Sequence, residues 1–216
     1  MRIFVDIETI GTDDLTIVAE IAAGIKPPGN MSKLETIAKW EAEEKPAAVK
    51  EAVSKTAFDG GLGRVICVCA AADEGVITTI IGEEPDLLVG LREWLEQAAR
   101  GNHGPVSVVG HNVAWDVRFL WQRYIVNNIK PPRAIVAASR AKPWDIEDTM
   151  LLWNPERDRK ISLDRLCKAL HIPSSKGELD GSKVWDYFRA GRINEIADYC
   201  RADVEAMRAC HQRMVA

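Results

Sequence analysis

Short apolar runs and alternating apolar residues predict four β-strands in this sequence. In the first, apolar residues at positions 3, 5 and 7 alternate with Phe4 and the carboxylates Asp6 and Glu8, and successive side chains of a strand point to opposite faces. The predicted strands cover residues 3–8, 65–70, 76–81 and 106–109. Asp73-Glu74-Gly75 separates the second from the third and indicates a hairpin.

Apolar residues at helical spacing predict the remaining elements of the core. The helices cover about residues 85–101, 114–124, 149–153, 163–170, 184–188 and 196–210. Asp148 and Ser162 are suited to cap the starts of two of them. Three strands in a meander, a helix, a fourth strand and further helices predict an α/β protein with helices on both faces of the sheet.

A long excursion, residues 11–60, separates the first strand from the second. Its first part, 15–23, has helical spacing with Asp13 or Asp14 as a cap, although periodicity alone also allows a strand. Residues 32–35 (Ser-Lys-Leu-Glu) form a capping-box pattern for a second helix, and Pro46 suits the first turn of a third. We expect a helical insertion or lid here.

Composition restricts the class of protein. The 216 residues are 47% hydrophobic and include no apolar stretch of the roughly 20 residues that a membrane helix needs. No signal peptide is visible at the start. The five cysteines are odd in number and lack the paired spacing of zinc sites, so we expect free, buried thiols in a reducing cytoplasm.

The net charge of −4 argues against a basic coat that would bind nucleic acid non-specifically. Basic residues are nevertheless concentrated between 118 and 168. They are Arg118, Arg123, Lys130, Arg133, Arg140, Lys142, Arg157, Arg159, Lys160, Arg165 and Lys168. This region could bind phosphates or could be an ordinary solvated surface.

Asp6 and Glu8 are the first candidate site. They lie on one face of an otherwise apolar strand, where two neighbouring carboxylates resist ionisation unless cations hold them. Mg²⁺ and Mn²⁺ prefer such oxygen ligands. The alternative is an edge strand with two solvated acids, and a single Asp-x-Glu pattern does not decide between them.

Two further candidate sites follow along the chain. Asp116 lies in the first turns of a helix after a strand, preceded by His111 and Asn112, although an acid at a helix start is often only a surface residue. Tyr199 and Asp203 are four residues apart and share one helix face. That face is apolar, so Asp203 points inward and needs a partner or a metal; Tyr199 could be that partner.

These three motifs together resemble those of the DEDD 3′–5′ exonucleases of the ribonuclease H-like superfamily. Asp6-x-Glu8, Asn112-x-x-x-Asp116 and Tyr199-x-x-x-Asp203 occur in the same order. A histidine five residues before the last acid marks one subclass, but position 198 is Asp, which implies the tyrosine (DEDDy) subclass. The chain is similar to stand-alone proteins that resemble the proofreading domain of family B DNA polymerases.

The resemblance covers residues 1 to about 210 apart from the excursion. It implies an α/β, ribonuclease H-like mixed sheet, with an antiparallel meander plus parallel strands, flanked by helices. Residues 1–216 would form one exonuclease domain, with 11–60 as a helical insertion after the first strand.

The resemblance also implies the chemistry. Two divalent cations, Mg²⁺ or Mn²⁺, would be bound by the carboxylates of Asp6, Glu8, Asp116 and Asp203. Tyr199 would orient the attacking water, because a phenol with a pKa near 10 is a poor base at neutral pH. Thr9, His111 and Asn112 would bind the terminal nucleotide.

The implied function is removal of 5′-mononucleotides from the 3′ end of single-stranded DNA. An RNase D-like exoribonuclease is the first alternative, since no residue clearly senses a 2′-hydroxyl. A catalytically silent nucleic-acid-binding module of the same fold is the second. The chain is too short to include a polymerase, so a role in proofreading would require a separate replication or repair partner.

Overall fold

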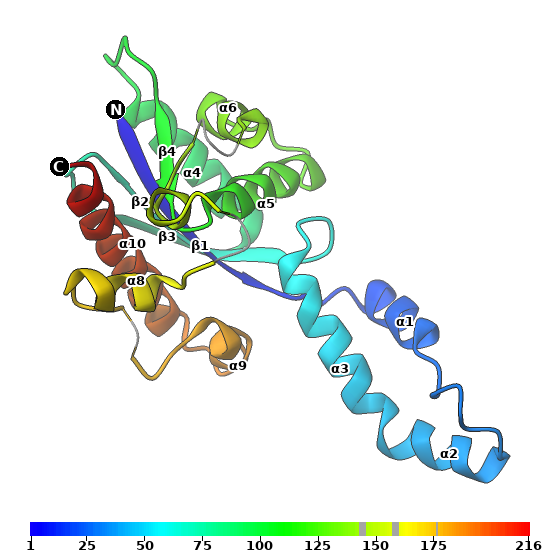
Figure 1. The fold of residues 1–216 in the computed structure, drawn as a ribbon. Coiled ribbons are helices and arrows are strands. Elements are labelled where there is room, and N and C mark those ends of the chain that lie inside the picture. The colour runs from blue at the N-terminus through cyan, green and yellow to red at the C-terminus, as the bar shows by residue number, and fades with distance from the viewer. Residues whose placement is uncertain (143–145, 157–159, 176) are drawn as a thin grey trace. The chain divides into compact units, whose positions relative to one another are not determined.

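The structure is a computed structural model, and it describes residues 1–142, 146–156, 160–175 and 177–216 (Figure 1). The chain divides into two compact units. The first contains residues 1–8 and 65–216, and the second contains residues 9–64.

The first unit is built around a five-stranded mixed sheet of order β3-β2-β1-β4-β5. The strands are β1 (Arg2–Ile10), β2 (Arg64–Ala72), β3 (Thr78–Ile81), β4 (Ser107–Gly110) and β5 (Glu147–Asp148). β2 and β3 are antiparallel, whereas β1 pairs in parallel with β4, and β4 with β5. The expected mixed α/β sheet is therefore confirmed, with one additional strand. β5 has only two residues, too few for an alternating pattern.

The two faces of the sheet are covered by different helices (Figure 1). Ile3, Val5 and Ile7 enter a core with apolar residues of α4 (Glu84–Ala98) and α5 (Val113–Val126). The alternate residues of β1 face α10 (Ile193–Val215), where the ring of Phe4 makes an edge contact with His211. Asp6 and Glu8 share that second face, because side chains of a strand alternate.

Further helices complete this unit: α6 (Arg133–Arg140), α7 (Thr149–Trp153), α8 (Leu163–Leu170), η2 (Gly181–Lys183) and α9 (Val184–Arg189). Asp148 and Ser162 cap α7 and α8 as predicted, accepting hydrogen bonds from the backbone of Met150 and Arg165. α6 was not predicted. Within the described residues, none of the helices combines the length and apolar character needed to cross a membrane.

The second unit is helical, with α1 (Leu15–Gly24), α2 (Leu34–Glu43), α3 (Lys45–Lys55) and η1 (Thr56–Phe58). Asp14 caps α1 through the backbone N–H of Thr16, so the strand alternative for this segment is wrong. The capping-box prediction is also wrong. Lys33, not Ser32, precedes the first turn of α2, and it provides no side-chain cap.

Candidate active site

Four carboxylates from three elements gather on the α10 face of the sheet. Asp6 and Glu8 come from β1, Asp116 from the first turn of α5, and Asp203 from the middle of α10. We call these four side chains the carboxylate cluster. Glu8 and Asp116 are only 8% and 6% exposed. The sequence motifs, up to 197 residues apart, therefore supply one continuous group of acids.

The raised pKa values of the four acids reflect burial and repulsion among their charges. Burial raises the pKa of Asp6 well above its usual range, and repulsion from Glu8, Asp116 and Asp203 raises it further. The pKa of Glu8 is raised by burial and then by Asp203 and Asp116. Burial also raises the pKa of Asp116 and of Asp203. Without a cation, this group resists carrying four negative charges.

One oxygen of the cluster is suited to bind a metal ion. Oδ2 of Asp6 is buried and has no hydrogen-bond partner in the described part of the chain. Among those residues, no lysine or arginine forms an ion pair with any of the four acids. Unpaired buried carboxylates are costly, and hard divalent cations are bound by such oxygens. The donor set therefore fits a divalent cation.

Ser175 and Tyr199 both act on the Asp203 carboxylate. The Ser175 hydroxyl donates a short hydrogen bond to Oδ1 of Asp203, and the nearby Tyr199 hydroxyl lowers the pKa of the same carboxylate. Burial, followed by the charge of Asp203, raises the pKa of Tyr199 above its usual value. The phenol therefore remains protonated at neutral pH and acts as a hydrogen-bond donor. Ser175 was not predicted, since its loop carries no recognisable motif.

Asn112 begins α5 with a left-handed backbone, φ 65°, and its own side chain is exposed. Its backbone N–H donates to Oδ1 of Asp148, at 2.9 Å. Asp148 is 3% exposed and its charge contributes to the raised pKa of Asp116. The sequence indicated Asp148 only as a helix cap. The structure adds a second role: Asp148 accepts a hydrogen bond from the Asn112 backbone and so holds the turn between β4 and α5.

His111 holds two segments together. Its Nδ1 lies 2.9 Å from the Thr149 hydroxyl, and its Nε2 lies 2.8 Å from the Ile161 carbonyl oxygen. Burial lowers the pKa of His111, so the ring is neutral at pH 7. With both nitrogens engaged by the protein, His111 has no free ring atom for a nucleotide. Thr9 lies in the second unit, where its hydroxyl donates to the Ala57 carbonyl at 2.8 Å.

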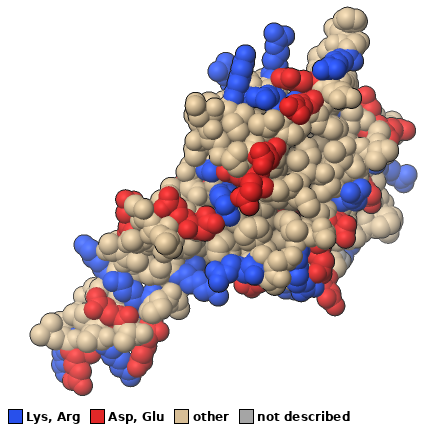
Figure 2. Space-filling model, turned by 180° about the vertical axis from the view of Figure 1, so that it is seen from behind, with Lys and Arg blue, Asp and Glu red and all other residues tan. Residues whose placement is uncertain are grey.

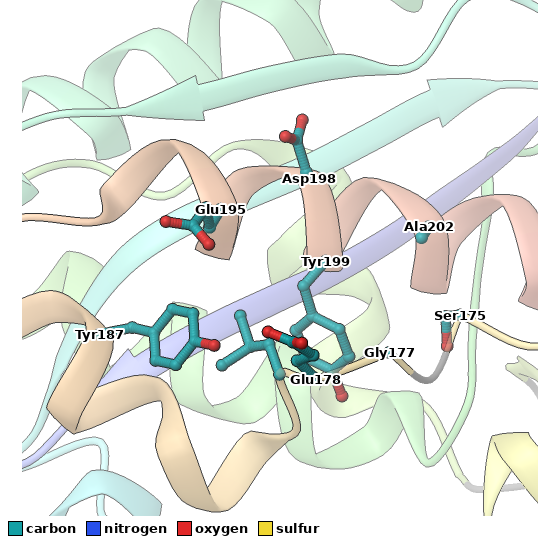
Figure 3. Close-up of a pocket in the computed structure, with 9 residues that line it drawn as sticks. Ser175, Gly177, Glu178, Tyr187, Glu195, Asp198, Tyr199 and Ala202 are labelled. Carbon is teal, nitrogen blue, oxygen red and sulfur yellow. The ribbon is translucent and has the colours of Figure 1, made fainter.

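A pocket of about 310 Å³ lies beside Tyr199 (Figure 3). Tyr187 from α9 and Tyr199 from α10 project into the same region, with Glu178 between them. Glu178, Glu195 and Asp198 are the acids of the lining. This side of the site therefore repels phosphate and suits a neutral part of a ligand.

On the face that Figure 2 shows, the basic side chains of the described residues do not form one continuous surface. On the face seen in Figure 2, lysines and arginines are interspersed with acids. Arg123, one of the basic residues between 118 and 168, is 6% exposed and paired with Glu84, so it cannot contact phosphate. Arg157 and Arg159 lie outside the described residues.

Comparison with known proteins gives a family. Residues 65–208, well over half of the chain, match the model of a family described as a predicted 3′-5′ exonuclease related to the exonuclease domain of PolB. The chain belongs to this family. The matched segment carries Asp116, Tyr199 and Asp203, whereas Asp6 and Glu8 precede it. Comparison with curated proteins gave no significant match.

The fold of this PolB-related exonuclease family member is also similar to a solved polymerase. The family B DNA polymerase from the hyperthermophilic archaeon Pyrobaculum calidifontis superposes with a TM-score of 0.59 at 15% identity. The match covers 99% of this chain but only 24% of the polymerase. The family B exonuclease-like fold is thus confirmed. Exonuclease domains of this kind use divalent metals.

Proposed function

We propose that this chain is a metal-dependent 3′–5′ exonuclease that shortens single-stranded DNA and releases 5′-mononucleotides. The supporting observation is the carboxylate cluster, in which four acids meet without a lysine or arginine partner among the described residues. The proposal treats residues 1–216 as one exonuclease domain, with 11–60 as a helical insertion or lid.

Asp6, Glu8, Asp116 and Asp203 would hold two ions, Mg²⁺ or Mn²⁺. Bound there, the ions would offset the charge of the phosphodiester and activate water for in-line displacement. The chain's own contribution is to fix the ligands. The hydrogen bond from Ser175 orients the Asp203 carboxylate, while the nearby Tyr199 hydroxyl and Ile7 backbone favour the ionised forms of Asp203 and Asp116.

Tyr199 would hold the attacking water by donating a hydrogen bond from its hydroxyl. The raised pKa excludes it as a general base at neutral pH, because the phenolate is not populated. Asn112, exposed at the start of α5, would bind the terminal sugar. The acidic pocket beside Tyr199 would receive a neutral part of the terminal nucleotide. Thr9 is proposed as a further nucleotide contact. His111, whose ring nitrogens contact Thr149 and Ile161, would hold the turn next to Asn112 in place.

The decisive experiment is digestion of one sequence as 5′-labelled single-stranded DNA and as RNA, with Mn²⁺ or Mg²⁺. We expect stepwise shortening of DNA from a free 3′ end, no shortening when that end is blocked, and none in EDTA. An unchanged rate on blocked DNA would indicate an endonuclease, and faster digestion of RNA would favour the RNase D-like alternative.

The proposed role of Tyr199 has its own test. Tyr199→Phe should lower kcat on the order of 10²- to 10⁴-fold, since positioning groups for proton transfer contribute that much. Mn²⁺ affinity should hardly change. The matched control is Tyr187→Phe, which removes a hydroxyl from the same pocket and should leave kcat within a few-fold. Wild-type turnover in Tyr199→Phe would restrict the hydroxyl to holding Asp203.

A further inference from the structure

Three buried cysteines gather next to the carboxylate cluster. Cys67 and Cys69 are two residues apart on β2 and share one face, and Cys200 lies on α10. All three are fully buried, and their sulfur atoms lie within 4.8 Å of one another. Although no pair of them follows a zinc-like sequence spacing, the packing of α10 on the sheet creates a three-thiol group.

The thiol group adjoins oxygen ligands. Sγ of Cys200 and one carboxylate oxygen each from Asp6 and Glu8 also lie within 4.8 Å of one another. Cys200 therefore belongs to both groups, and its sulfur lies 3.4 Å from the Asp6 carbonyl oxygen. Asp6 is partly exposed, so an ion that reaches the carboxylates from solvent arrives next to a sulfur. The unpartnered Oδ2 of Asp6 offers a further oxygen ligand.

We propose that Cys67, Cys69 and Cys200 form a site for a thiophilic metal ion, with a carboxylate oxygen of Asp6 or Glu8 as fourth ligand. Zn²⁺ fits this donor set. Tetrahedral zinc with Zn–S bonds of about 2.3 Å places its sulfur ligands about 3.8 Å apart, within reach of small side-chain movements here. Mg²⁺ and Mn²⁺ do not favour sulfur, so this site differs in chemistry from the proposed catalytic one.

The chain holds an internal comparison for this arrangement. Cys167 of α8 and Cys210 of α10 are also fully buried, with sulfur atoms 3.6 Å apart. They lie in an apolar cluster with Leu166 and Ala206. Two sulfurs cannot complete a tetrahedral site, so this pair should remain a packed thiol pair.

Sharing of ligands has a consequence for the carboxylate cluster. An ion bound by the three sulfurs would occupy an oxygen of Asp6 or Glu8. Bound Zn²⁺ would therefore weaken binding of Mn²⁺ to the cluster, and by reciprocity Mn²⁺ would weaken binding of Zn²⁺. The site itself does not depend on whether the chain cleaves nucleic acid.

The test is a titration of the fully reduced protein with Co²⁺, a coloured substitute for Zn²⁺, in excess Mg²⁺. We expect one equivalent of Co²⁺ to produce intense thiolate-to-cobalt absorption and the visible bands of tetrahedral cobalt, both abolished by one equivalent of Zn²⁺. Cys200→Ala should bind at least about tenfold more weakly and, with two sulfur ligands left, show much weaker thiolate absorption at one equivalent of Co²⁺. Cys167→Ala, the matched control, should behave as the wild type.

A second variant keeps the test valid if the first one does not fold. Should Cys200→Ala not fold, Cys69→Ala removes a sulfur from the sheet side of the site and must show the same loss. The proposal is overturned if the reduced wild type shows no thiolate-to-cobalt absorption, or if Cys167→Ala loses it while Cys200→Ala and Cys69→Ala keep it.

Discussion

The sheet-containing unit has two sites with buried carboxylates, Glu84 and the carboxylate cluster, and they differ in whether the protein provides a positive charge beside them. Glu84, at the start of α4, accepts hydrogen bonds from Nε and Nη2 of Arg123 at 2.9 and 2.7 Å. Its oxygens also accept from the Val65 backbone and the Asn127 amide. Glu84 and Arg123 are 5% and 6% exposed. This is a complete ion pair, in which the chain provides its own cation.

Glu8 and Asp116 of the carboxylate cluster are about as buried, Asp6 and Asp203 are half-buried, and none of the four pairs with a lysine or arginine of the described residues. The four acids repel one another, their pKa values are raised, and Oδ2 of Asp6 has no partner among the described residues. Burial therefore does not separate a structural acid from a functional one. Under the proposed function, the two kinds of acid differ in the source of the compensating charge, which is Arg123 for Glu84 and would be a cation from solvent for Asp6, Glu8, Asp116 and Asp203.

Removing the internal cation should have the largest effect on stability. Arg123→Leu leaves Glu84 buried without its charge partner, which typically costs about 3–5 kcal/mol. For a chain of this length, that corresponds to a decrease in Tm of roughly 6–20 °C. Thermal melting in EDTA measures it.

The control removes both charges of the pair. Glu84→Leu combined with Arg123→Leu leaves no unpaired ion and should recover much of the lost stability. If the single and double variants melt at the same temperature, loss of side-chain packing, and not the unpaired Glu84 charge, destabilises the protein.

Adding Mn²⁺ should have the next largest effect on stability, and this effect should depend on the carboxylate cluster alone. Mn²⁺ at a hundredfold excess over its Kd should stabilise the fold by about 2.7 kcal/mol, or roughly 5–11 °C in Tm. Arg123→Leu should gain as much, because its defect lies elsewhere. A wild type whose Tm ignores Mn²⁺ would contradict the proposed metal site.

Much of this contrast was accessible from the sequence. The alternation in β1 places Asp6 and Glu8 on one face, and the i,i+4 spacing places Tyr199 beside Asp203. These rules are local, so they hold before the fold is known. The same local reasoning failed at residues 32–35, where a capping-box pattern did not cap the helix.

What the sequence could not reveal depends on contacts between distant segments. Arg123 was grouped with surface basic residues, because nothing in its neighbourhood indicates that Glu84, 39 residues away, would pair with it. Ser175 meets Asp203 from a loop without a motif. The sulfurs of Cys67 and Cys200 meet only because α10 packs on that face of the sheet.

A change of pH should distinguish the cluster from an ordinary set of acids. Its carboxyl pKa values are raised in the folded state, so the native protein holds more protons than the unfolded one near neutrality. Their stabilising contribution is present at low pH and is lost as pH rises through the raised pKa values. The apo protein should therefore be more stable at pH 6 than at pH 8, by up to about 1.4 kcal/mol per pH unit for each extra proton.

The measurement for that effect is Tm at both pH values, in EDTA and in excess Mn²⁺. With Mn²⁺ the trend should reverse, since protons compete with the metal for the same oxygens. An apo protein that melts lower at pH 6 than at pH 8 would mean that the cluster does not dominate the proton balance.

The smallest effect concerns a single charge, and its sign is the informative part. In EDTA, Asp203→Asn removes repulsion on Asp6 and Glu8 while an oxygen remains to accept from Ser175. The variant should melt at or above the wild type, by up to about 1 kcal/mol, although most substitutions of partly buried residues destabilise. In Mn²⁺ its Tm should rise much less than that of the wild type, because it has lost a ligand.

The matched control is Glu205→Gln, which changes an exposed acid on the same helix and should follow the wild type in both conditions. If Asp203→Asn instead melts below the wild type in EDTA and gains equally from Mn²⁺, Asp203 is a structural acid like Glu84.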